Sequence, residues 1–171
     1  MTPLHVREIG EGPRVVLVHG AMLNAARTWS AQEELIERWR LILPDRRGFA
    51  PNPPDGPSDF ERDADDLVDF ARTDCAPVGH SYGAVVALLM AAAAPDTVQS
   101  LTVVEPPVLQ PARGVAEVED AIARHEELVR LDDPDPVYRG MLRTLGAPEP
   151  RRSLTELERR HVRLLIGERR P

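Results

Sequence analysis

The stretch VGHSYGAVVALLMAAAAPD, residues 78–96, joins a short apolar run to a long alanine-rich one through a single serine. The first run is typical of a short strand, and the second of a buried helix that ends at Pro95. Gly79 and Gly83 flank Ser81 in a G-x-S-x-G pattern at the junction of the two runs. A strand that turns directly into a helix needs a tight, strained turn, and small neighbours let it pass close to other backbone. The pattern therefore predicts that Ser81 occupies such a turn.

Ser81 is a candidate nucleophile because a helix start favours negative charge. The free N–H groups and the positive dipole end of the helix would stabilise a developing oxyanion, and the N–H of Tyr82 would be one donor. The second donor should come from another loop at the same edge of the sheet. The turn HGAM, residues 19–22, follows a buried run and offers the N–H of Ala21 or Met22.

Short apolar runs alternate with amphipathic ones along the first two thirds of the chain, which predicts an α/β fold with a mostly parallel sheet flanked by helices. The run RVVLVHG is expected to be buried on both faces, and so is VQSLTVVEPP. Capping boxes at SAQE and SDFE predict helix starts at residues 30 and 58. Strands are expected at LHVREI, RVVLVHG, LILPD, CAPVGHS and VQSLTVVEPP.

The pattern changes after Pro107, because no further strand-like run appears. Helical spacing covers residues 114–131, a shorter helix is expected over residues 139–145, and a third capping box, SLTE, begins a helix at residue 153 that ends at Gly167. We therefore expect two parts: an α/β core over residues 1–107 and a helical lid segment over residues 108–171.

Several motifs together resemble the α/β-hydrolase family: VVLVHGA, LPDRRGFAPN, VGHSYGAVVALLMAAAAPDTV and LTVVEPP, in that family's order and at roughly its spacing. The resemblance covers about residues 4–107. It implies that Ser81 is the nucleophile and that Ala21 and Tyr82 supply the oxyanion hole. A serine nucleophile is similar to that of the esterase, lipase, acyltransferase and haloperoxidase-like members, whereas epoxide hydrolases and haloalkane dehalogenases use an aspartate.

The chain departs from the family pattern at its C-terminal end. Family members carry two more strands after the lid helices, usually with the catalytic aspartate and histidine, and no such strand or terminal G-H follows Pro107 here. The expectation is therefore a truncated hydrolase. A serine hydroxyl without a base is a poor nucleophile, and the oxyanion hole alone leaves a rate that is orders of magnitude lower.

Candidates for the acid and the base remain within the chain. Glu105 ends a predicted strand at the carboxyl edge, where it is either the acid or a solvated strand end. His125 and His161 take places on the apolar stripes of lid helices, where each is either a substitute base or a packing residue. His19 and Asp45 are expected to hold their loops by hydrogen bonds.

Net charge and cysteine content limit the classes of partner and the compartment that we expect for this chain. The net charge of −7 argues against nucleic acid and against an anionic membrane surface. Cys75 is the single cysteine, and the N-terminus lacks the apolar region of a signal peptide, so we expect the cytoplasm. The motifs imply neither a metal nor an organic cofactor.

Two functions are open at this point. The first is a serine hydrolase that acts on a small ester, thioester or amide through an acyl-enzyme intermediate, with a small-molecule substrate. The second is an inactive hydrolase-fold fragment that folds or associates only with a partner chain. In the second case a sheet edge left bare by missing strands would invite self-association.

Overall fold

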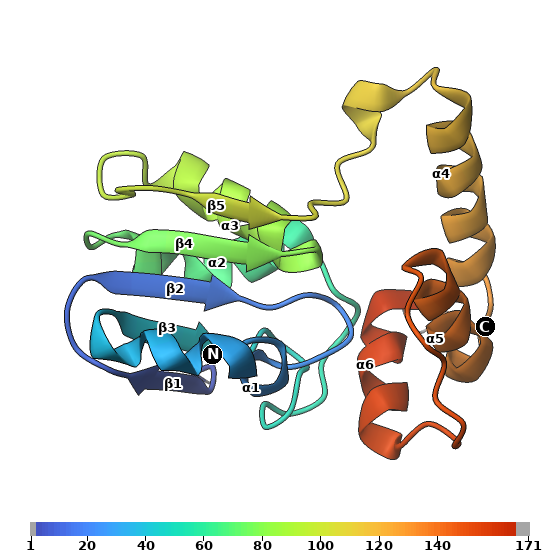
Figure 1. Ribbon diagram of the computed structural model, residues 1–171, viewed down its shortest axis with the longest axis horizontal. Coiled ribbons are helices and arrows are strands. Elements are labelled where there is room, and N and C mark those ends of the chain that lie inside the picture. The colour runs from blue at the N-terminus through green and yellow to red at the C-terminus, as the bar shows by residue number, and fades with distance from the viewer. Residues whose placement is uncertain (1–2, 167–171) are drawn as a thin grey trace.

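The computed structural model describes residues 3–166, and its centre is one five-stranded sheet (Figure 1). The strand order is β1-β3-β2-β4-β5. All neighbours pair in parallel except β1 and β3, which are antiparallel. This arrangement confirms the predicted α/β class with a mostly parallel sheet. The strands are β1 Val6–Ile9, β2 Arg14–Val18, β3 Arg40–Pro44, β4 Ala76–His80 and β5 Thr102–Val104.

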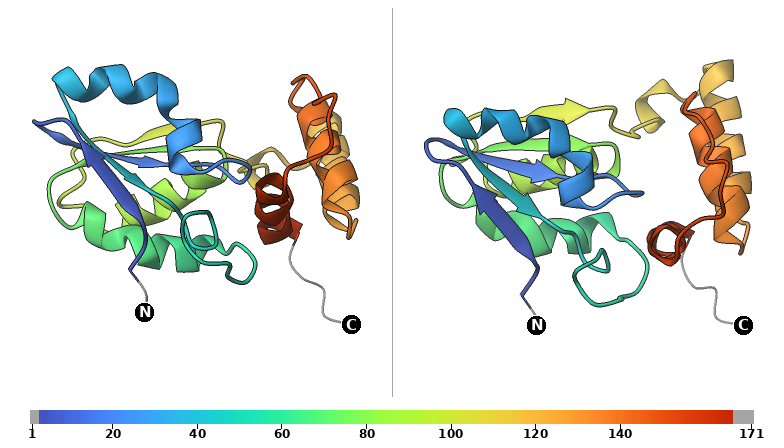
Figure 2. Two further views of the ribbon diagram at one scale, coloured as in Figure 1. Left: turned by 90° about the horizontal axis from the view of Figure 1, so that it is seen from below. Right: turned by 60° about the horizontal axis from the view of Figure 1, so that its bottom comes forward.

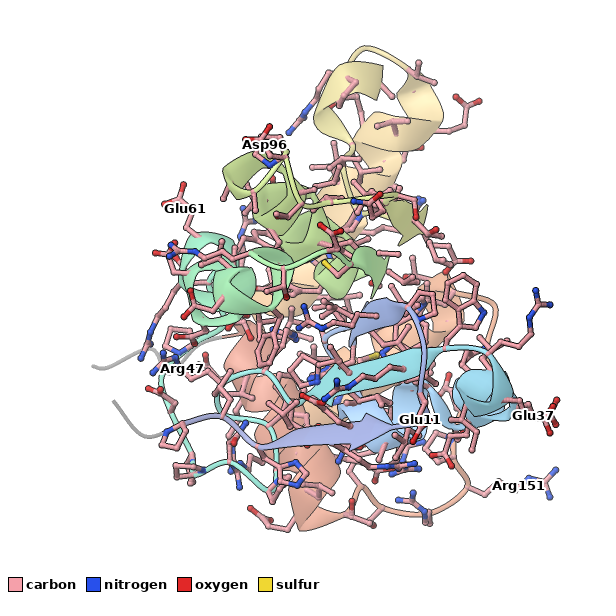
Figure 3. The ribbon with its side chains drawn as sticks, turned by 90° about the vertical axis from the view of Figure 1, so that its left-hand side faces the viewer. Glu11, Glu37, Arg47, Glu61, Asp96 and Arg151 are labelled. Atoms are coloured by element: carbon pink, nitrogen blue, oxygen red, sulfur yellow. The ribbon has the colours of Figure 1, made fainter. Side chains whose placement is uncertain are left out.

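Helices cover both faces of the sheet, as Figure 2 shows. One face carries α1 (Ala25–Thr28) and the 3₁₀ helix η1 (Ser30–Glu37). The opposite face carries α2 (Phe60–Ala71) and α3 (Tyr82–Ala93). The acidic side chains labelled in Figure 3, such as Glu37 and Glu61, lie at the surface of these helices, where the net negative charge of the chain is solvated.

The alternation of side chains along β2 divides the core into two parts. Val16 and Val18 face α2 and α3, whereas Leu17 between them packs against Ala25 and Trp29 on the other face. All three strand residues are buried, which confirms the prediction of a central strand.

The C-terminal segment is helical and lies beyond the carboxyl ends of the parallel strands (Figure 1). It contains the short 3₁₀ turn η2 (Gln110–Ala112), then α4 (Ala116–Val129), α5 (Pro134–Thr144) and α6 (Glu156–Ile166). α5 packs against both α4 and α6. Helix α6 faces the loops of the sheet, where Arg160 donates hydrogen bonds to the carbonyl of Gly48 at 3.0 and 2.6 Å. Within the described residues, none of the helices has the length and apolarity needed to cross a membrane.

The predicted capping boxes are only partly right. SAQE opens a 3₁₀ helix whose N-cap is Trp29, not an α-helix capped by Ser30. Asp59 rather than Ser58 caps α2, because its carboxylate accepts from the N–H of Arg62 at 2.8 Å. The third box forms two residues later than expected, between Thr155 and Glu158. The predicted C-terminal end of this helix, Gly167, lies outside the described residues.

Two further expectations about elements were wrong. The strand at Thr102–Val104 is exposed at all three positions, because it is the last strand of the sheet and no element of the described chain pairs with its outer edge. Helix α5 begins at Pro134 rather than at residue 139. Its N-cap Asp133 accepts from the N–H of Asp135 at 3.0 Å, and proline is well tolerated in the first helical turn.

Candidate active site

Ser81 is the single residue between β4 and α3, and its backbone conformation is strained. Its φ of 53° and ψ of −121° lie in a region that favours glycine. The Ser81 N–H donates to the carbonyl of Val104 at 2.8 Å, which ties the turn to the neighbouring strand β5. The Ser81 side chain makes no capping hydrogen bond to α3, so its hydroxyl is not engaged by the helix start.

The two flanking glycines let the turn pack directly against backbone. A Cβ on Gly79 would lie 2.2 Å from the carbonyl oxygen of Gly83. A Cβ on Gly83 would lie 2.3 Å from the carbonyl oxygen of Val18 in β2. Real Cβ atoms do not approach backbone so closely, so both positions require glycine for the reason that the sequence pattern suggested.

The HGAM turn, residues 19–22, lies beside Ser81. A Cβ on Gly20 would be 3.4 Å from Cβ of Ser81 and 3.2 Å from Nδ1 of His80. The turn that carries Ala21 and Met22 is therefore adjacent to the serine, and Tyr82 begins the helix on its other side. These are the residues whose N–H groups the sequence assigned to the oxyanion hole.

His19 and Asp45 hold the loops around the serine, as predicted. The His19 ring accepts from the N–H of Arg46 through Nε2 at 2.9 Å, so the proton lies on Nδ1, which donates to the carbonyl of Gly20 at 2.8 Å. Burial lowers the pKa of His19 well below its ordinary value, with a further contribution from the Arg46 charge, and this keeps the ring neutral. Asp45 accepts from the N–H of Ala25 at 2.8 Å.

The acid candidate Glu105 lies directly after β5, and the histidine nearest to its carboxylate is His80. Its carboxylate is 3.8 Å from Nε2 of His80, the residue before the nucleophile candidate. The Glu105 side chain is 75% exposed, and its backbone has a φ of 51°. The structure thus brings Glu105 to the serine turn, but places it next to neither His125 nor His161.

His161 extends from α6 to the HGAM turn. Its Nδ1 lies 3.2 Å from the carbonyl of Met22, and its ring packs against Phe49 at 4.5 Å between centroids. The residue is only 3% exposed, and burial lowers the pKa of His161, so the imidazole is neutral. Because Nδ1 donates to a carbonyl, Nε2 keeps a free lone pair, and it has no hydrogen-bond partner.

His125 is exposed on α4, the helix farthest from the sheet (Figure 1). The hollow of about 660 Å³ between α4 and α5 is lined by Arg124, Leu128 and Gly140 among others, and its lining includes neither His125 nor any residue of the serine turn. Within residues 3–166, no imidazole is hydrogen bonded to Ser81, and no group of three or more acidic, histidine or cysteine side chains is arranged to hold a metal ion.

Sequence reasoning missed one residue of the site, Arg46. The residue is 1% exposed, and its guanidinium donates to the carbonyl of Gly20 in the HGAM turn. The signal that could have found it is Asp63, an acidic residue placed on the apolar stripe of α2 beside Ala64 and Leu67. A carboxylate on a buried helix face requires a cationic or hydrogen-bonding partner.

Comparison with known proteins agrees with this geometry. A protein-family model described as the alpha/beta hydrolase family matches residues 15–169. A pimeloyl-[acyl-carrier protein] methyl ester esterase of Aliivibrio salmonicida (strain LFI1238) is 28% identical over 161 residues, which are 92% of this chain and 62% of that protein. Lipase LipV of Mycobacterium tuberculosis is 31% identical over 125 residues, 70% of this chain and 48% of the lipase.

The fold is also that of solved structures. A hydrolase from Pseudomonas aeruginosa PA01 superposes with a TM-score of 0.63 at 21% identity, covering 96% of this chain and 63% of the other. The chain therefore spans less than two thirds of the length of each of these three relatives.

Proposed function

This chain belongs to the alpha/beta hydrolase family, and on that premise we propose that it is a serine hydrolase that cleaves a small ester, thioester or amide through an acyl-enzyme intermediate. Ser81 is the nucleophile, and the N–H groups of Tyr82 and of Ala21 or Met22 stabilise the oxyanion. The observation that carries the proposal is the strained turn at Ser81 with the HGAM turn beside it. The names of the similar proteins, an esterase and a lipase, support an ester as the first substrate to test.

The reaction begins when the Ser81 oxygen attacks the carbonyl carbon and its proton passes to a base. The carbonyl oxygen becomes an oxyanion between the two backbone donors, and the alcohol, thiol or amine then leaves with the proton. Water later releases the acyl group by the same route. In a well-studied case, loss of one hydrogen-bond donor at the oxyanion lowers the rate by a factor of about 10² to 10³.

Two histidines of the described chain are candidates for the base that accepts the Ser81 proton. His161 has a neutral ring with a free Nε2 lone pair, but that ring is buried against Phe49. His80 adjoins Ser81 and pairs with Glu105. Without a base in hydrogen-bonding contact, we expect turnover that is orders of magnitude below that of a complete triad. Ser81 is therefore either activated by a base or active only at a low residual rate, and one experiment separates these two cases.

The test is labelling of Ser81 by a fluorophosphonate, followed by intact mass. We expect one label per chain, and we expect Ser81→Ala to remove it. Ser100→Ala is the matched control, because Ser100 is an exposed serine that precedes β5, and it should label as the wild type does. Labelling that survives Ser81→Ala would refute the assignment of the nucleophile.

The rate of labelling then identifies the base. A rate that falls at least tenfold in His161→Gln and not in His80→Gln would assign proton transfer to the lid helix α6. The reverse would assign it to the His80–Glu105 pair, and Glu105→Gln should then have the same effect. A slow rate that no histidine variant changes would mean residual activity from the oxyanion donors alone.

A second function is favoured by one observation, the exposed strand β5. Under this alternative the chain is catalytically inactive and associates through that edge with another chain. A folded sample that fails to label at Ser81 and that sediments as an oligomer would support it. For either function we propose a reducing cytoplasm, because the chain has a single cysteine, Cys75, and therefore no internal disulfide.

A further inference from the structure

Arg46 follows β3, and its guanidinium reaches behind the HGAM turn. Nη2 donates to the carbonyl of Gly20 at 3.0 Å, and Nε donates to the carbonyl of His19 at 3.2 Å. Nη1 donates to Oδ2 of Asp63 in α2 at 2.5 Å. Two consecutive peptide groups of the turn are therefore held by one side chain, which is itself anchored to a helix on the far side.

Two aromatic rings contact the guanidinium. Its carbon lies 4.1 Å from the ring centroid of Tyr82 and 4.6 Å from that of Phe49. Tyr82 is also the residue whose N–H is the oxyanion donor proposed at the start of α3. Arg46 thus contacts both segments that would supply the oxyanion hole, the HGAM turn through its carbonyls and the start of α3 through a ring.

The orientation of one peptide group carries the inference. In a trans peptide the C=O and the following N–H point in opposite directions. The Gly20 carbonyl is bound by Nη2 of Arg46 and by Nδ1 of His19, so it points toward these donors. The N–H of Ala21 must then point to the other side of the turn. Gly20 adjoins Ser81, and we infer that a carbonyl attacked by Ser81 would approach the turn from the side opposite Arg46.

We propose that Arg46 is a positioning residue that fixes the Gly20–Ala21 peptide so that the Ala21 N–H faces the oxyanion. This inference rests on the proposed serine hydrolase function, and it adds a residue that acts without touching substrate. Holding loops together alone would not require a buried ion pair, since well-packed apolar residues serve that purpose at least as well. The guanidinium of Arg46 reaches three acceptors at once, two of them in the same turn, through three different nitrogens, which a lysine ammonium has no fork to do.

The variant Arg46→Met/Asp63→Leu tests the inference, because it removes both charges and leaves no unpaired carboxylate. The matched control is Arg47→Met/Asp66→Leu. Arg47, labelled in Figure 3, is the next residue and binds Asp66 of the same helix through Nε at 2.8 Å, with no hydrogen bond to the HGAM turn. Arg46→Lys is the conservative variant, because it keeps a positive charge beside Asp63 but offers fewer directed donors. If the double variant does not fold, Arg46→Lys tests whether Arg46 positions the Gly20–Ala21 peptide.

The first readout is the fluorophosphonate reaction at Ser81, measured over a range of reagent concentrations. We expect the saturating rate to fall about 30-fold in Arg46→Met/Asp63→Leu, with the half-saturating concentration unchanged within about twofold. Arg46→Lys should lie between this variant and the wild type, and the Arg47 control should keep the wild-type rate. A loss of equal size in the Arg47 control, or a change in the half-saturating concentration alone, would overturn the proposal.

The second readout does not depend on activity. In ¹⁵N relaxation of the folded proteins, the amides of Gly20 and Ala21 should be as rigid as their neighbours in the wild type and in the Arg47 control. They should become mobile in both Arg46 variants. If the wild type fails to label, the proposed function fails, and the relaxation data still decide whether Arg46 fixes this peptide. Unchanged Gly20 and Ala21 amides in the Arg46 variants would refute it.

Discussion

At the scale of single residues, Ser81 shows a conflict between conformation and stability. A serine with a φ of 53° and a ψ of −121° is destabilised sterically by about 1 to 3 kcal/mol. The hydrogen bond from the Ser81 N–H to the Val104 carbonyl holds the backbone in this conformation. Glycine would not bear that penalty, although it loses more backbone entropy on folding, by about 0.5 to 1 kcal/mol. The strain is thus retained because it presents a hydroxyl at the turn.

We therefore predict that Ser81→Gly is more stable than Ser81→Ala by about 1 kcal/mol, because only glycine relieves the strained backbone. Urea unfolding followed by circular dichroism would measure the difference. At Ser100, which has no such conformation, the order should reverse, with the glycine variant less stable than the alanine variant by about 0.5 kcal/mol. Equal stability of the two Ser81 variants would mean that the turn is not strained.

Local patterns predicted some residues of the site and not others. Ser81, His19 and Asp45 could be assigned because each directly follows or ends an apolar run, and the end of a parallel strand fixes where its next residues lie. Arg46 could not, because an arginine after a strand is usually solvated. Its role depends on Asp63, a residue of another element, and on two backbone carbonyls that no pattern of side chains encodes.

At the scale of elements, side-chain hydrogen bonds mark the starts of α2, α5 and α6. The start of α6 is a reciprocal capping box, in which Glu158 accepts from the N–H of Thr155 at 2.8 Å and Thr155 Oγ1 accepts from the N–H of Glu158 at 3.2 Å. Arg152 adds two hydrogen bonds to the same carboxylate. The sequence predicted this helix but placed its cap two residues too early, because SLTE and TELE both offer a capping residue followed by a glutamate.

The Glu158 cap predicts a pH dependence of stability. Chiefly through its hydrogen bonds with Arg152, the pKa of Glu158 is lowered from about 4.5 to about 2. A carboxylate with a lowered folded-state pKa stabilises the protein above pH 4.5, and this contribution is lost as the pH falls from 4.5 to 2. Glu158→Gln should cost about 2 kcal/mol at pH 7, a value reduced for the solvent exposure of Arg152.

The measurement is urea unfolding of wild type and Glu158→Gln at pH 7 and at pH 3, where the difference should have shrunk by about half. Glu156→Gln is the control, since Glu156 is in the same first turn but exposed, with Arg163 at 3.6 Å as its only ion pair in the described chain. It should change stability by less than about 0.5 kcal/mol at either pH. A difference for Glu158→Gln that is independent of pH would exclude a charge-dependent cap.

At the scale of the whole molecule, the sheet was predictable and its outer boundary was not. A central strand such as β2 can be predicted from the sequence because the residues on both of its faces are apolar. The run at β5 is just as apolar, yet Val103 and Val104 are 38% and 40% exposed. Burial of an edge strand depends on what pairs with it, and that information lies outside the strand. The contact of α6 with the loops after β2 and β3 likewise rests on long-range hydrogen bonds that periodicity does not carry.

The outer edge of β5 carries backbone polar groups that no strand of the described chain pairs with, and we therefore predict self-association through this edge. Val104 pairs with His80, and its carbonyl accepts from the N–H of Ser81, so its backbone polar groups point inward to β4. Because successive residues of a strand alternate in direction, the N–H and C=O of Val103 point outward. No partner of the described chain takes them. Exposed groups of this kind are a template for another strand.

We expect sedimentation velocity to show concentration-dependent association, and Val103→Pro to weaken it about five- to tenfold, the value of about one lost hydrogen bond. Proline removes the outward N–H but none of the bonds to β4, which makes it tolerable at an edge. Leu88→Lys is the control, because Leu88 is an exposed apolar residue on α3 rather than on the strand. If Leu88→Lys abolishes association and Val103→Pro does not, the chains meet through a helix face. A monomer at every concentration would show that this edge remains unpaired in solution, despite three exposed strand residues.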